Sequence, residues 1–401
     1  MSSAAPLTGI RVLDLSRILA GPISTQVLAD LGADVVKVER PGAGDDTRQW
    51  GPPFLEPDGP SAYYLSCNRG KRSLALDLAG EKGRATLDDL VRRADVMIEN
   101  FLPEAMRAFG LAPTRLRELN PKLVSCSISA FGRRGPMADR PGYDLMIQAM
   151  SGLMSITGET KGTPMKVGVA ITDVITGLYA ATSVLAGLSD VARGGQGRAF
   201  DVALADCTLA SLVNVAQSTL VTGERPKRWG NAHPNIVPYE VFQTADGFLA
   251  LAIGADRQWQ KFCQLVERHD WADDPRFGTN PQRVAHRNDL VQLLKPLLSS
   301  RSSAVWQEML THIDVPHSPV VPLDTALSAT QVAGRGMVQE VTDAAGRKFR
   351  ILGSPIHWVD AQPSAPRPPP ALGEHSDEVL REWLAYDDTR IAELREAGVV
   401  A

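Results

Sequence analysis

The sequence predicts an α/β fold in which a mostly parallel sheet is covered by helices. Short apolar runs alternate with segments of helical spacing between residues 10 and 128, and Gly or Pro residues mark many of the changes between them. The composition, with 44% hydrophobic and 22% charged residues, is that of an ordinary globular protein. A length of 401 residues is enough for roughly two to three domains.

The first strand, helix and second strand are predicted near the N-terminus. Residues 10–15 form an apolar run, and Pro22 suits the first turn of the helix that follows it. Gly32 ends this helix, and the apolar run at residues 34–39 is the next predicted strand. This order of strand, helix and strand implies parallel pairing.

The same alternation continues downstream. Strands are predicted at residues 94–99 and 123–128, and helices at residues 81–93, 103–109 and 113–119. Residues 41–72 are rich in Gly, Pro and Arg and are too long for a plain connection. Long loops of this kind are often functional.

The chain is expected to contain three segments: a large domain over residues 1–225, a small domain over residues 226–325, and a linker with a C-terminal segment over residues 326–401. Within the small domain, a hairpin is predicted to turn at Asp246-Gly247. In the last segment, the Pro-rich linker at residues 362–370 precedes a final helix that begins near Ser376.

Charge and residue spacing exclude several classes of function. The 42 basic and 46 acidic residues give a net charge of -4, so nucleic acid is not an expected partner. No apolar stretch approaches about 18 uninterrupted residues and the N-terminus lacks a signal-peptide pattern, so we expect a soluble, cytoplasmic protein that does not bind membranes. The seven His and four Cys residues show no ligand spacing, so no metal site or disulfide framework is expected.

Asp173 is the residue that most directly suggests chemistry. It follows an apolar run at residues 167–171, which predicts a strand, and precedes an apolar segment at residues 174–188, which predicts a helix. At such a junction, free backbone N–H groups and the helix dipole would keep its carboxylate ionised, as a nucleophile requires. The same position suits a helix cap, and caps are much commoner than nucleophilic aspartates. The residues alone therefore favour the cap.

The predicted sheet also suggests a nucleotide-like ligand. A nicotinamide dehydrogenase is disfavoured, although Glu39 ends the second strand, because residues 16–21 contain one glycine where the dinucleotide fingerprint needs three. Basic residues cluster in loops after the strands: Arg17, Arg40, Arg48, Arg69, Lys71, Arg72, Arg133 and Arg134. They would suit a ligand with several phosphates, or they are solvated surface charges.

Motifs spread over nearly the whole chain point to one family. They are residues 6–15, 20–22, 31–40, 67–73, 95–101, 142–144, 172–173 and 372–375. In this order they resemble the class III CoA-transferases, the family that includes formyl-CoA transferase and carnitine CoA-transferase. Further segments resemble most the succinyl-CoA:glutarate branch of this family, namely residues 41–48, 50–54, 228–233 and 236–239.

The resemblance implies an enzyme of EC 2.8.3 type that moves CoA from an acyl-CoA such as succinyl-CoA to a dicarboxylate such as glutarate. Asp173 matches the family's nucleophile, which forms an aspartyl anhydride and then an aspartyl-CoA thioester. Among side chains, only a carboxylate can form both intermediates. Gly230 and Asn231 match a glycine-containing loop whose backbone amides stabilise an oxyanion, although an ordinary turn is the alternative.

The resemblance also implies how CoA binds and how the chain assembles. The matching residues for CoA are Ile18, Leu19, Arg40, Leu76, Asn100, Phe101, Arg107 and Tyr143. CoA thioesters are substrates, so no tightly bound cofactor and no metal is implied. The expected architecture is an interlocked homodimer whose Rossmann-like large domain is completed by the C-terminal segment.

An α-methylacyl-CoA racemase on the same fold is the alternative. Racemases of this family carry Gly-His-Asp where this chain has Gly142-Tyr143-Asp144. A tyrosine with an ordinary pKa near about 10 is a poor proton acceptor at neutral pH, which favours the transferase. A CoA-binding protein without catalysis also stays open, and the sequence does not identify the acceptor acid, because small dicarboxylates differ by only one or two methylene groups.

Overall fold

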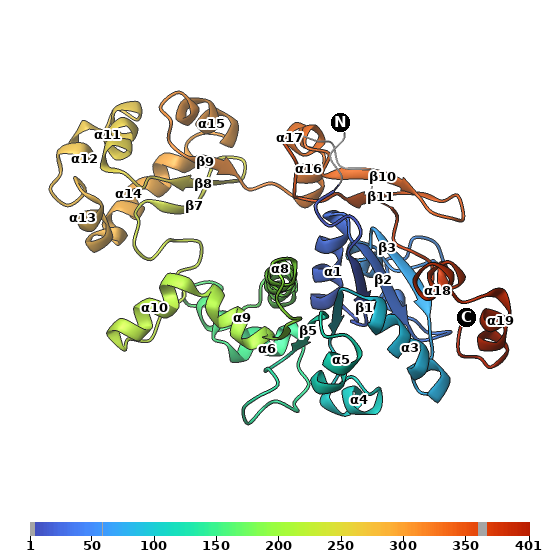
Figure 1. The fold of residues 1–401 in the computed structure, drawn as a ribbon. Coiled ribbons are helices and arrows are strands. Elements are labelled where there is room, and N and C mark those ends of the chain that lie inside the picture. Colours follow the sequence, from blue (N-terminus) through green and yellow to red (C-terminus); the bar gives the residue numbers. More distant parts are fainter. Residues whose placement is uncertain (1–4, 58, 360–366) are drawn as a thin grey trace. The chain divides into compact units, whose positions relative to one another are not determined.

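A computed structural model describes residues 5–57, 59–359 and 367–401 of the chain (Figure 1). The chain divides into two compact units. The first comprises the chain up to Leu153, Val167–Gly223 and Gln331–Ala401, and the second comprises Met154–Lys166 and Glu224–Thr330. Residues 362–366 of the predicted Pro-rich linker lie outside the described residues.

The first unit is built on a six-stranded parallel sheet, which confirms the predicted α/β class. Its strands are β1 (Arg11–Asp14), β2 (Asp34–Glu39), β3 (Lys71–Ala75), β4 (Val96–Glu99), β5 (Val124–Ser129) and β6 (Ala199–Ala203). The spatial order is β3-β2-β1-β4-β5-β6, which is the order of Rossmann-type sheets. The direction of winding therefore reverses between β1 and β4.

Helices connect the strands of the first unit, and an antiparallel pair of strands lies near its C-terminal part. The helices are α1 (Ala20–Asp30), the 3-10 helix η1 (Asp46–Gln49), α2 (Ala62–Ser66), α3 (Glu81–Arg93), α4 (Pro103–Ala108), α5 (Pro113–Leu119), α6 (Asp144–Met150), α8 (Ile171–Ala192), α9 (Leu204–Ser211), α10 (Val213–Thr222), α18 (Ser376–Leu384) and α19 (Asp388–Glu396). The separate pair is β10 (Val338–Thr342) and β11 (Lys348–Leu352).

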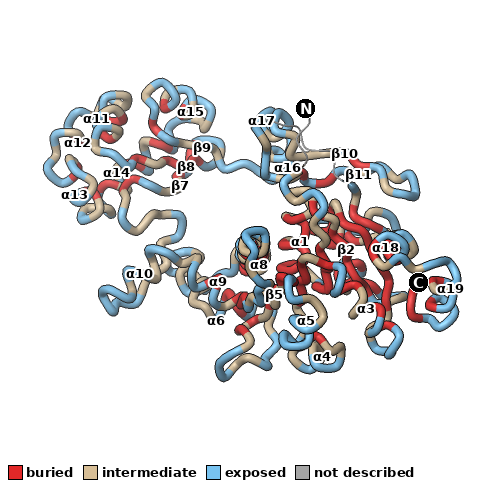
Figure 2. Tube along the Cα trace, viewed as in Figure 1, coloured by how far each residue is buried: buried red, intermediate tan, exposed pale blue. Residues whose placement is uncertain are grey.

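Both faces of the parallel sheet are buried, because successive strand residues point to opposite faces. Val12 of β1 lies in one apolar cluster with side chains of α1 and α8. Leu13, the next residue, lies in a second cluster with side chains of α3, α5, α18 and α19. Figure 2 shows this buried core around β1 and β2. The last two helices therefore pack on the same sheet as the N-terminal strands.

The second unit has its own core around a three-stranded antiparallel sheet. Its elements are β7 (Tyr239–Gln243), β8 (Phe248–Ala252), α11 (Asp256–Leu265), α12 (His269–Asp273), α13 (Asn280–Ala285), α14 (Arg287–Ser299), α15 (Ser303–Thr311), β9 (His317–Pro319) and α16 (Leu323–Leu327). The predicted hairpin is confirmed as β7 and β8. Trp259, Phe262, Leu294 and Trp306 are fully buried in its core. Two short helices occur where the chain passes between units, α7 (Leu153–Ile156) and α17 (Thr330–Gly334).

Helix α8 is long and apolar enough to cross a bilayer by length and composition, as is the bent pair α9 and α10 taken together. In this fold α8 packs against α1, β5 and β6. Thr176, Ala180 and Val184 on its sheet-facing side are buried. Core helices meet the same length and composition criterion, so α8 is weak evidence for a membrane span.

Three expectations about residues 154–173 differ from the structure. Residues 167–170 form no strand, because the Val167 N–H donates to the Gln148 side chain (2.9 Å) rather than to a neighbouring strand. Helix α8 starts at Ile171 after the N-cap residue Ala170, so Asp173 lies in the first turn and is not the cap. Residues 154–166, expected in the large domain, group with the second unit, where the Arg228 guanidinium donates to carbonyl groups of this segment.

The close approach of α1 and α8 depends on Gly177. A Cβ atom at this position would lie 2.6 Å from the Ala20 carbonyl oxygen and 3.0 Å from the Ile23 Cγ2. Helix propensity alone would favour Gly177→Ala by about 0.5–1 kcal/mol, but we expect a net loss of about 1–3 kcal/mol because the clash is with backbone. Urea unfolding measures this change. Gly168→Ala is the control, since nothing lies within 4 Å of a Cβ there, and equal midpoints for the two variants would contradict the predicted clash.

Candidate functional site

The candidate site lies at the carboxyl edge of the parallel sheet, beside the neighbouring strands β1 and β4. The chain adds strands in opposite directions on the two sides of this pair. Ligands of open α/β sheets bind outside the strand ends at this kind of reversal. Two sequence-predicted positions meet here: the Asn100 side chain accepts from the Arg17 N–H (2.9 Å) and donates to the Arg17 carbonyl (2.8 Å). Asn100 therefore fixes the loop after β1, and Ile18 and Leu19 follow in that loop.

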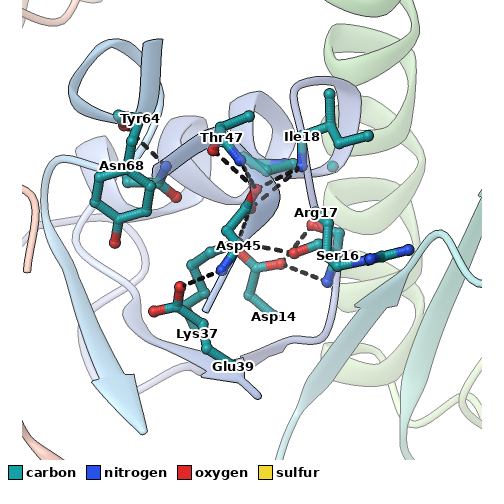
Figure 3. A network of polar contacts seen from close by, with 12 residues as sticks. Asp14, Ser16, Arg17, Ile18, Lys37, Glu39, Asp45, Thr47, Tyr64 and Asn68 are labelled. Carbon is teal, nitrogen blue, oxygen red and sulfur yellow. Dashed lines mark hydrogen bonds and ion pairs between the residues drawn. The ribbon is translucent and has the colours of Figure 1, made fainter. Parts of the chain in front are cut away.

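Ile18 adopts a backbone conformation that a β-branched residue rarely takes, with a φ of 73°. Its N–H donates to the Asp45 carboxylate (3.2 Å). Asp45 pairs with Lys37 at 2.9 Å, and both side chains are fully buried. The Lys37 ammonium also donates to the Ser16 carbonyl (2.8 Å), so one buried ion pair holds both ends of this turn, as Figure 3 shows. Strained backbone of this kind persists where surrounding contacts determine it, often at functional sites.

A second buried ion pair lies beside the first. The Lys71 ammonium is 3.1 Å from Asp14, and it also donates to the Pro22 and Asn68 oxygens (both 2.9 Å). Burial alone would raise the pKa of Asp14, but Lys71 and Lys37 outweigh it and lower the pKa to about 2. Burial likewise opposes the charged form of Lys37, yet its carboxylate neighbours, Asp45 first, raise the pKa of its ammonium.

Glu39, at the end of β2, is engaged inside the protein. The Arg48 guanidinium donates to both of its carboxylate oxygens (2.8 and 2.7 Å), and the Ser73 hydroxyl donates to one of them (2.7 Å). A dinucleotide-binding acid at this position must instead accept ribose hydroxyls. The structure therefore agrees with the missing glycine fingerprint.

The clustered basic residues are mostly neither phosphate ligands nor solvated charges. Five of them pair with carboxylates of the chain: Arg48 with Glu39, Arg69 with Asp30, Lys71 with Asp14, Arg72 with Asp34, and Arg133 with Glu99. Arg17 pairs with Asp46 at the surface. Within the described residues, Arg40 and Arg134 have no carboxylate partner. Arg40, predicted to bind CoA, is exposed at the end of β2 and is free to meet an anion.

Asp173 lies half-buried in the first turn of α8. Burial and the nearby Asp144 carboxylate raise its pKa from 3.8 to about 7. Burial and the like charge of Asp144 therefore oppose the ionised form, contrary to the expectation that the helix terminus keeps this carboxylate ionised. A carboxylate with this pKa is partly protonated at neutral pH and more basic than an ordinary aspartate.

Tyr63 is a neighbour of Asp173 that the sequence analysis missed. It lies on α2, and its ring packs edge-on against Trp50 with centroids 5.4 Å apart. Burial raises its pKa to about 12, with Asp173 as the next cause, so its hydroxyl stays a hydrogen-bond donor at neutral pH. The available signal was its place within the long loop segment at residues 41–72.

The other predicted CoA-binding residues differ in accessibility. Tyr143 and Arg107 are exposed, and Phe101 is half-buried with its ring edge-on to Phe109 at 5.2 Å. The side chains of Leu19 and Leu76 are buried. Leu76 lies in the apolar core with its N–H bonded to the Glu39 carbonyl, so its side chain is not positioned to meet a ligand in solution.

Gly230 and Asn231 lie in the second unit. They form the centre of a turn closed by the Ala232 N–H and the Trp229 carbonyl (3.1 Å), and Gly230 has a φ of 62°. Neither the Gly230 N–H nor the Asn231 N–H has an acceptor among the described parts of the chain. An ordinary turn and an oxyanion loop both fit this geometry, and the two free donors are what an oxyanion loop requires.

Metal ligation has no geometric basis in the described part of the chain, where no group of three or more His, Cys, Asp or Glu side chains is arranged to hold an ion. All four cysteines are free and buried. Burial raises the pKa of the Cys67 thiol to about 11 and that of Cys126 to about 12. These thiols are therefore poor nucleophiles.

Comparison with known proteins identifies relatives of this chain. Residues 7–376 match the family described as CoA-transferase family III. The chain is 46% identical to succinate–glutarate CoA-transferase of Agrobacterium fabrum, over 96% of this chain and 97% of that protein. It is 39% identical to succinyl-CoA:glutarate CoA-transferase of Homo sapiens, over 100% and 91%. A crystal structure of a CAIB/BAIF family protein from Brucella suis, 42% identical, matches with a TM-score of 0.84 over 95% of this chain and 100% of that one. These relatives confirm the resemblance found in the motifs.

The buried pair of Lys37 and Asp45 predicts a large effect of removing one charge. Lys37→Met leaves the Asp45 carboxylate buried without its ammonium partner, which typically costs about 3–5 kcal/mol. Chemical denaturation measures this loss. Arg17→Met removes an exposed ion pair with Asp46 and is the control, with an expected change below about 1 kcal/mol. Similar losses in the two variants would contradict the special role of the buried pair.

Proposed function

This chain belongs to CoA-transferase family III, and we propose that it moves CoA from succinyl-CoA to a dicarboxylic acid such as glutarate. Membership of the family makes it an enzyme of CoA-transferase type. The proposed donor and acceptor are taken from the names of two relatives, succinyl-CoA:glutarate CoA-transferase and succinate–glutarate CoA-transferase. Acids that differ by one methylene are separated by only about 1–3 kcal/mol in a pocket, so neighbouring dicarboxylates are expected as weaker acceptors.

Asp173 is the proposed nucleophile. Its carboxylate attacks the thioester carbonyl of succinyl-CoA. The C–S bond breaks, CoA departs as a thiolate, and a mixed aspartyl–succinyl anhydride remains on the enzyme. The thiolate then attacks the aspartyl carbonyl, which releases succinate and leaves an aspartyl-CoA thioester. Glutarate attacks this thioester to form a second anhydride and free thiolate, and the thiolate attacks the glutaryl carbonyl. Glutaryl-CoA and the original carboxylate result, so thioester energy is conserved.

The observation that carries this proposal is the environment of Asp173. The side chain is half-buried in the first turn of α8, and its pKa is raised to about 7. A basic carboxylate is a better nucleophile than an ordinary one, and pKa values shifted in this way cluster at functional sites. Its neighbour Tyr63 keeps a hydroxyl proton that can serve as a donor to charge that develops on an attacked carbonyl.

We propose that CoA binds at the carboxyl edge of the sheet, beside the ends of the neighbouring strands β1 and β4. The fixed loop at Ile18 and Leu19 and the half-buried ring of Phe101 meet at that edge, and Arg40 offers an unpaired guanidinium for a phosphate. The exposed Arg107 is a second candidate phosphate ligand. Tyr143 is proposed to pack near the thioester, and the free N–H groups of Gly230 and Asn231 are proposed oxyanion donors.

Racemisation is not favoured by any of these groups. It requires two residues that exchange a proton with the α-carbon, and Tyr143 replaces the histidine of the racemase motif. Solvent deuterium is therefore not expected to enter the acyl group of the substrate.

We also propose that the protein acts as a homodimer, since helices α9 and α10 of the first unit carry exposed apolar side chains. On α9 and α10, Leu209, Val213, Leu220 and Val221 are 51–79% exposed, and Figure 2 shows α10 as largely exposed and intermediate in burial. Apolar patches of this kind on a folded protein mark interaction surfaces. A second copy of the chain is the proposed occupant, and the interlocked arrangement rests on the family resemblance alone.

Asp173→Ala tests the proposed mechanism. We expect succinyl-CoA to give a covalent adduct with the wild type, and the variant to form none, with transfer to glutarate reduced by at least about 1,000-fold because no other group can replace the carboxylate. Intact-mass analysis and a transfer assay measure these changes. Asp206→Ala is the matched control, because Asp206 also lies in the first turn of a helix, α9, and should leave the adduct intact. An adduct that survives Asp173→Ala rules out Asp173 as the covalent carrier.

Light scattering tests the proposed dimer. The wild type is expected at twice the chain mass of 43.2 kDa. The double substitution Leu220→Glu and Val221→Glu places charge in the apolar surface and should give monomer. Val305→Glu, at an exposed position of α15 in the second unit, should not. A wild type that elutes and scatters as a monomer at micromolar concentration contradicts the dimer.

A further inference from the structure

The first turn of α8 receives its cap from another helix. Ala170, the N-cap residue, has no side-chain acceptor for the free N–H groups. Instead the Asp144 carboxylate, from the start of α6, accepts from the Thr172 N–H (2.9 Å) and from the Thr172 hydroxyl (2.7 Å) with the same oxygen. Thr172 is fully buried and is the residue directly before Asp173.

Asp144 is itself held in place. Its second carboxylate oxygen accepts from the Gln148 amide (2.7 Å), one turn further along α6. Gln148 is fully buried, and its carbonyl oxygen accepts from the Val167 N–H (2.9 Å). A continuous chain of hydrogen bonds therefore runs from the segment before α8, through α6, to the first turn of α8.

The elements packed against α8, namely α1, α6, α9, β5 and β6, contain no Lys or Arg. Their titratable side chains are Asp30, Cys126, Asp144, Asp201, Asp206 and Cys207, and Tyr63 of α2 adds a further neighbour of Asp173. The arginines that pair with α8, Arg193 and Arg198, contact Asp190 near its C-terminal end, far along the helix from Asp173. Asp30 is paired with Arg69, and Asp144 is the charged neighbour that acts on Asp173.

We propose that Asp144 is a positioning residue for the covalent chemistry, because its hydrogen bonds to Thr172 orient the first turn of α8 and the adjoining Asp173. Together with burial, its negative charge also disfavours ionisation of Asp173, which raises the pKa of that carboxyl group. The inference rests on the proposed role of Asp173 as the nucleophile. Asp144 forms no bond with substrate in this scheme. Two separable effects follow, one geometric and one electrostatic, and they are lost in different variants.

Asp144→Asn removes the negative charge and keeps the contact with Thr172. The amide oxygen can still accept from the Thr172 N–H and hydroxyl, whereas the NH2 group cannot accept from the Gln148 amide, so that one hydrogen bond is lost with the charge. In single-turnover adduct formation with succinyl-CoA, the rate of the wild type should rise with pH through an apparent pKa near 7. We expect Asp144→Asn to move this limb down by about one pH unit and to lower the rate at high pH several-fold, because Asp173 becomes less basic. Asp387→Asn, at the N-cap of α19, is the matched control and should move neither. An unmoved limb in Asp144→Asn overturns the electrostatic role.

Thr172→Val tests the geometric effect. It keeps the charge of Asp144 and the backbone N–H but removes the hydroxyl that donates at 2.7 Å. We expect adduct formation to slow by about tenfold with the acid limb still near pH 7. A rate equal to that of the wild type would overturn the positioning role.

A stability measurement reports on Asp173 without any catalysis. Its folded pKa, about 7, lies above its ordinary value of 3.8, so the folded state is progressively penalised as pH rises between these values. Asp173→Asn should therefore match the wild type in thermal midpoint below about pH 4 and exceed it above about pH 7. In the Asp144→Asn background this gain should be smaller and should appear at lower pH. If Asp173→Asn raises the thermal midpoint equally in the wild-type and Asp144→Asn backgrounds, the inference about Asp144 is contradicted, even where Asp173 proves essential for transfer. If the wild type forms no covalent adduct but the rise in midpoint differs between the backgrounds as expected, only the proposed function is contradicted.

Discussion

The buried charge network formed by residues of β1, β2 and β3 and of the loop after β2 is the constraint on which the first unit depends. Lys37 with Asp45, Lys71 with Asp14, and Arg48 with Glu39 are three ion pairs whose side chains are almost completely removed from solvent. Each ion is expensive to bury, and their mutual hydrogen bonds offset that cost only while every partner is present. Because Lys37 with Asp45 and Arg48 with Glu39 join β2 to the loop at residues 41–49, they fix that loop and the turn at Ile18 together.

Two aspartates of the same unit show opposite electrostatic environments. Asp14 is fully buried among ammonium groups, and its pKa is held at about 2. Asp173 is less buried and lies near the like charge of Asp144, and burial together with that charge raises its pKa to about 7. The first carboxylate is therefore permanently ionised and structural, and the second is basic and suited to chemistry. Environments that drive the pKa values of like residues apart commonly separate such roles.

The sequence predicts a phosphate site from clustered basic residues, but most of these residues pair with carboxylates in the structure. Arg48 and Arg133 lie after strands as expected, whereas Lys71, expected in a loop after a strand, is the first residue of β3. Each of the three pairs with a carboxylate of its own chain. Only the fold decides which of them face a carboxylate, because the partners lie from nine to fifty-seven residues away along the chain. Among the described residues of this cluster, Arg40 and Arg134 have no carboxylate partner.

The sequence by itself determined the alternation of strands and helices, the hairpin at Asp246-Gly247 and the family, because these depend on local periodicity, turn chemistry and the order of motifs. It did not predict the strands β3 and β6, whose mixed residues Lys71–Ala75 and Ala199–Ala203 lack a clear apolar pattern and are fixed by pairing with β2 and β5. It also missed Tyr63, the capping of α8 by Asp144, and the sign of the pKa shift of Asp173. Only the tertiary structure decided these, since burial and charge proximity are properties of residues brought together from distant parts of the chain.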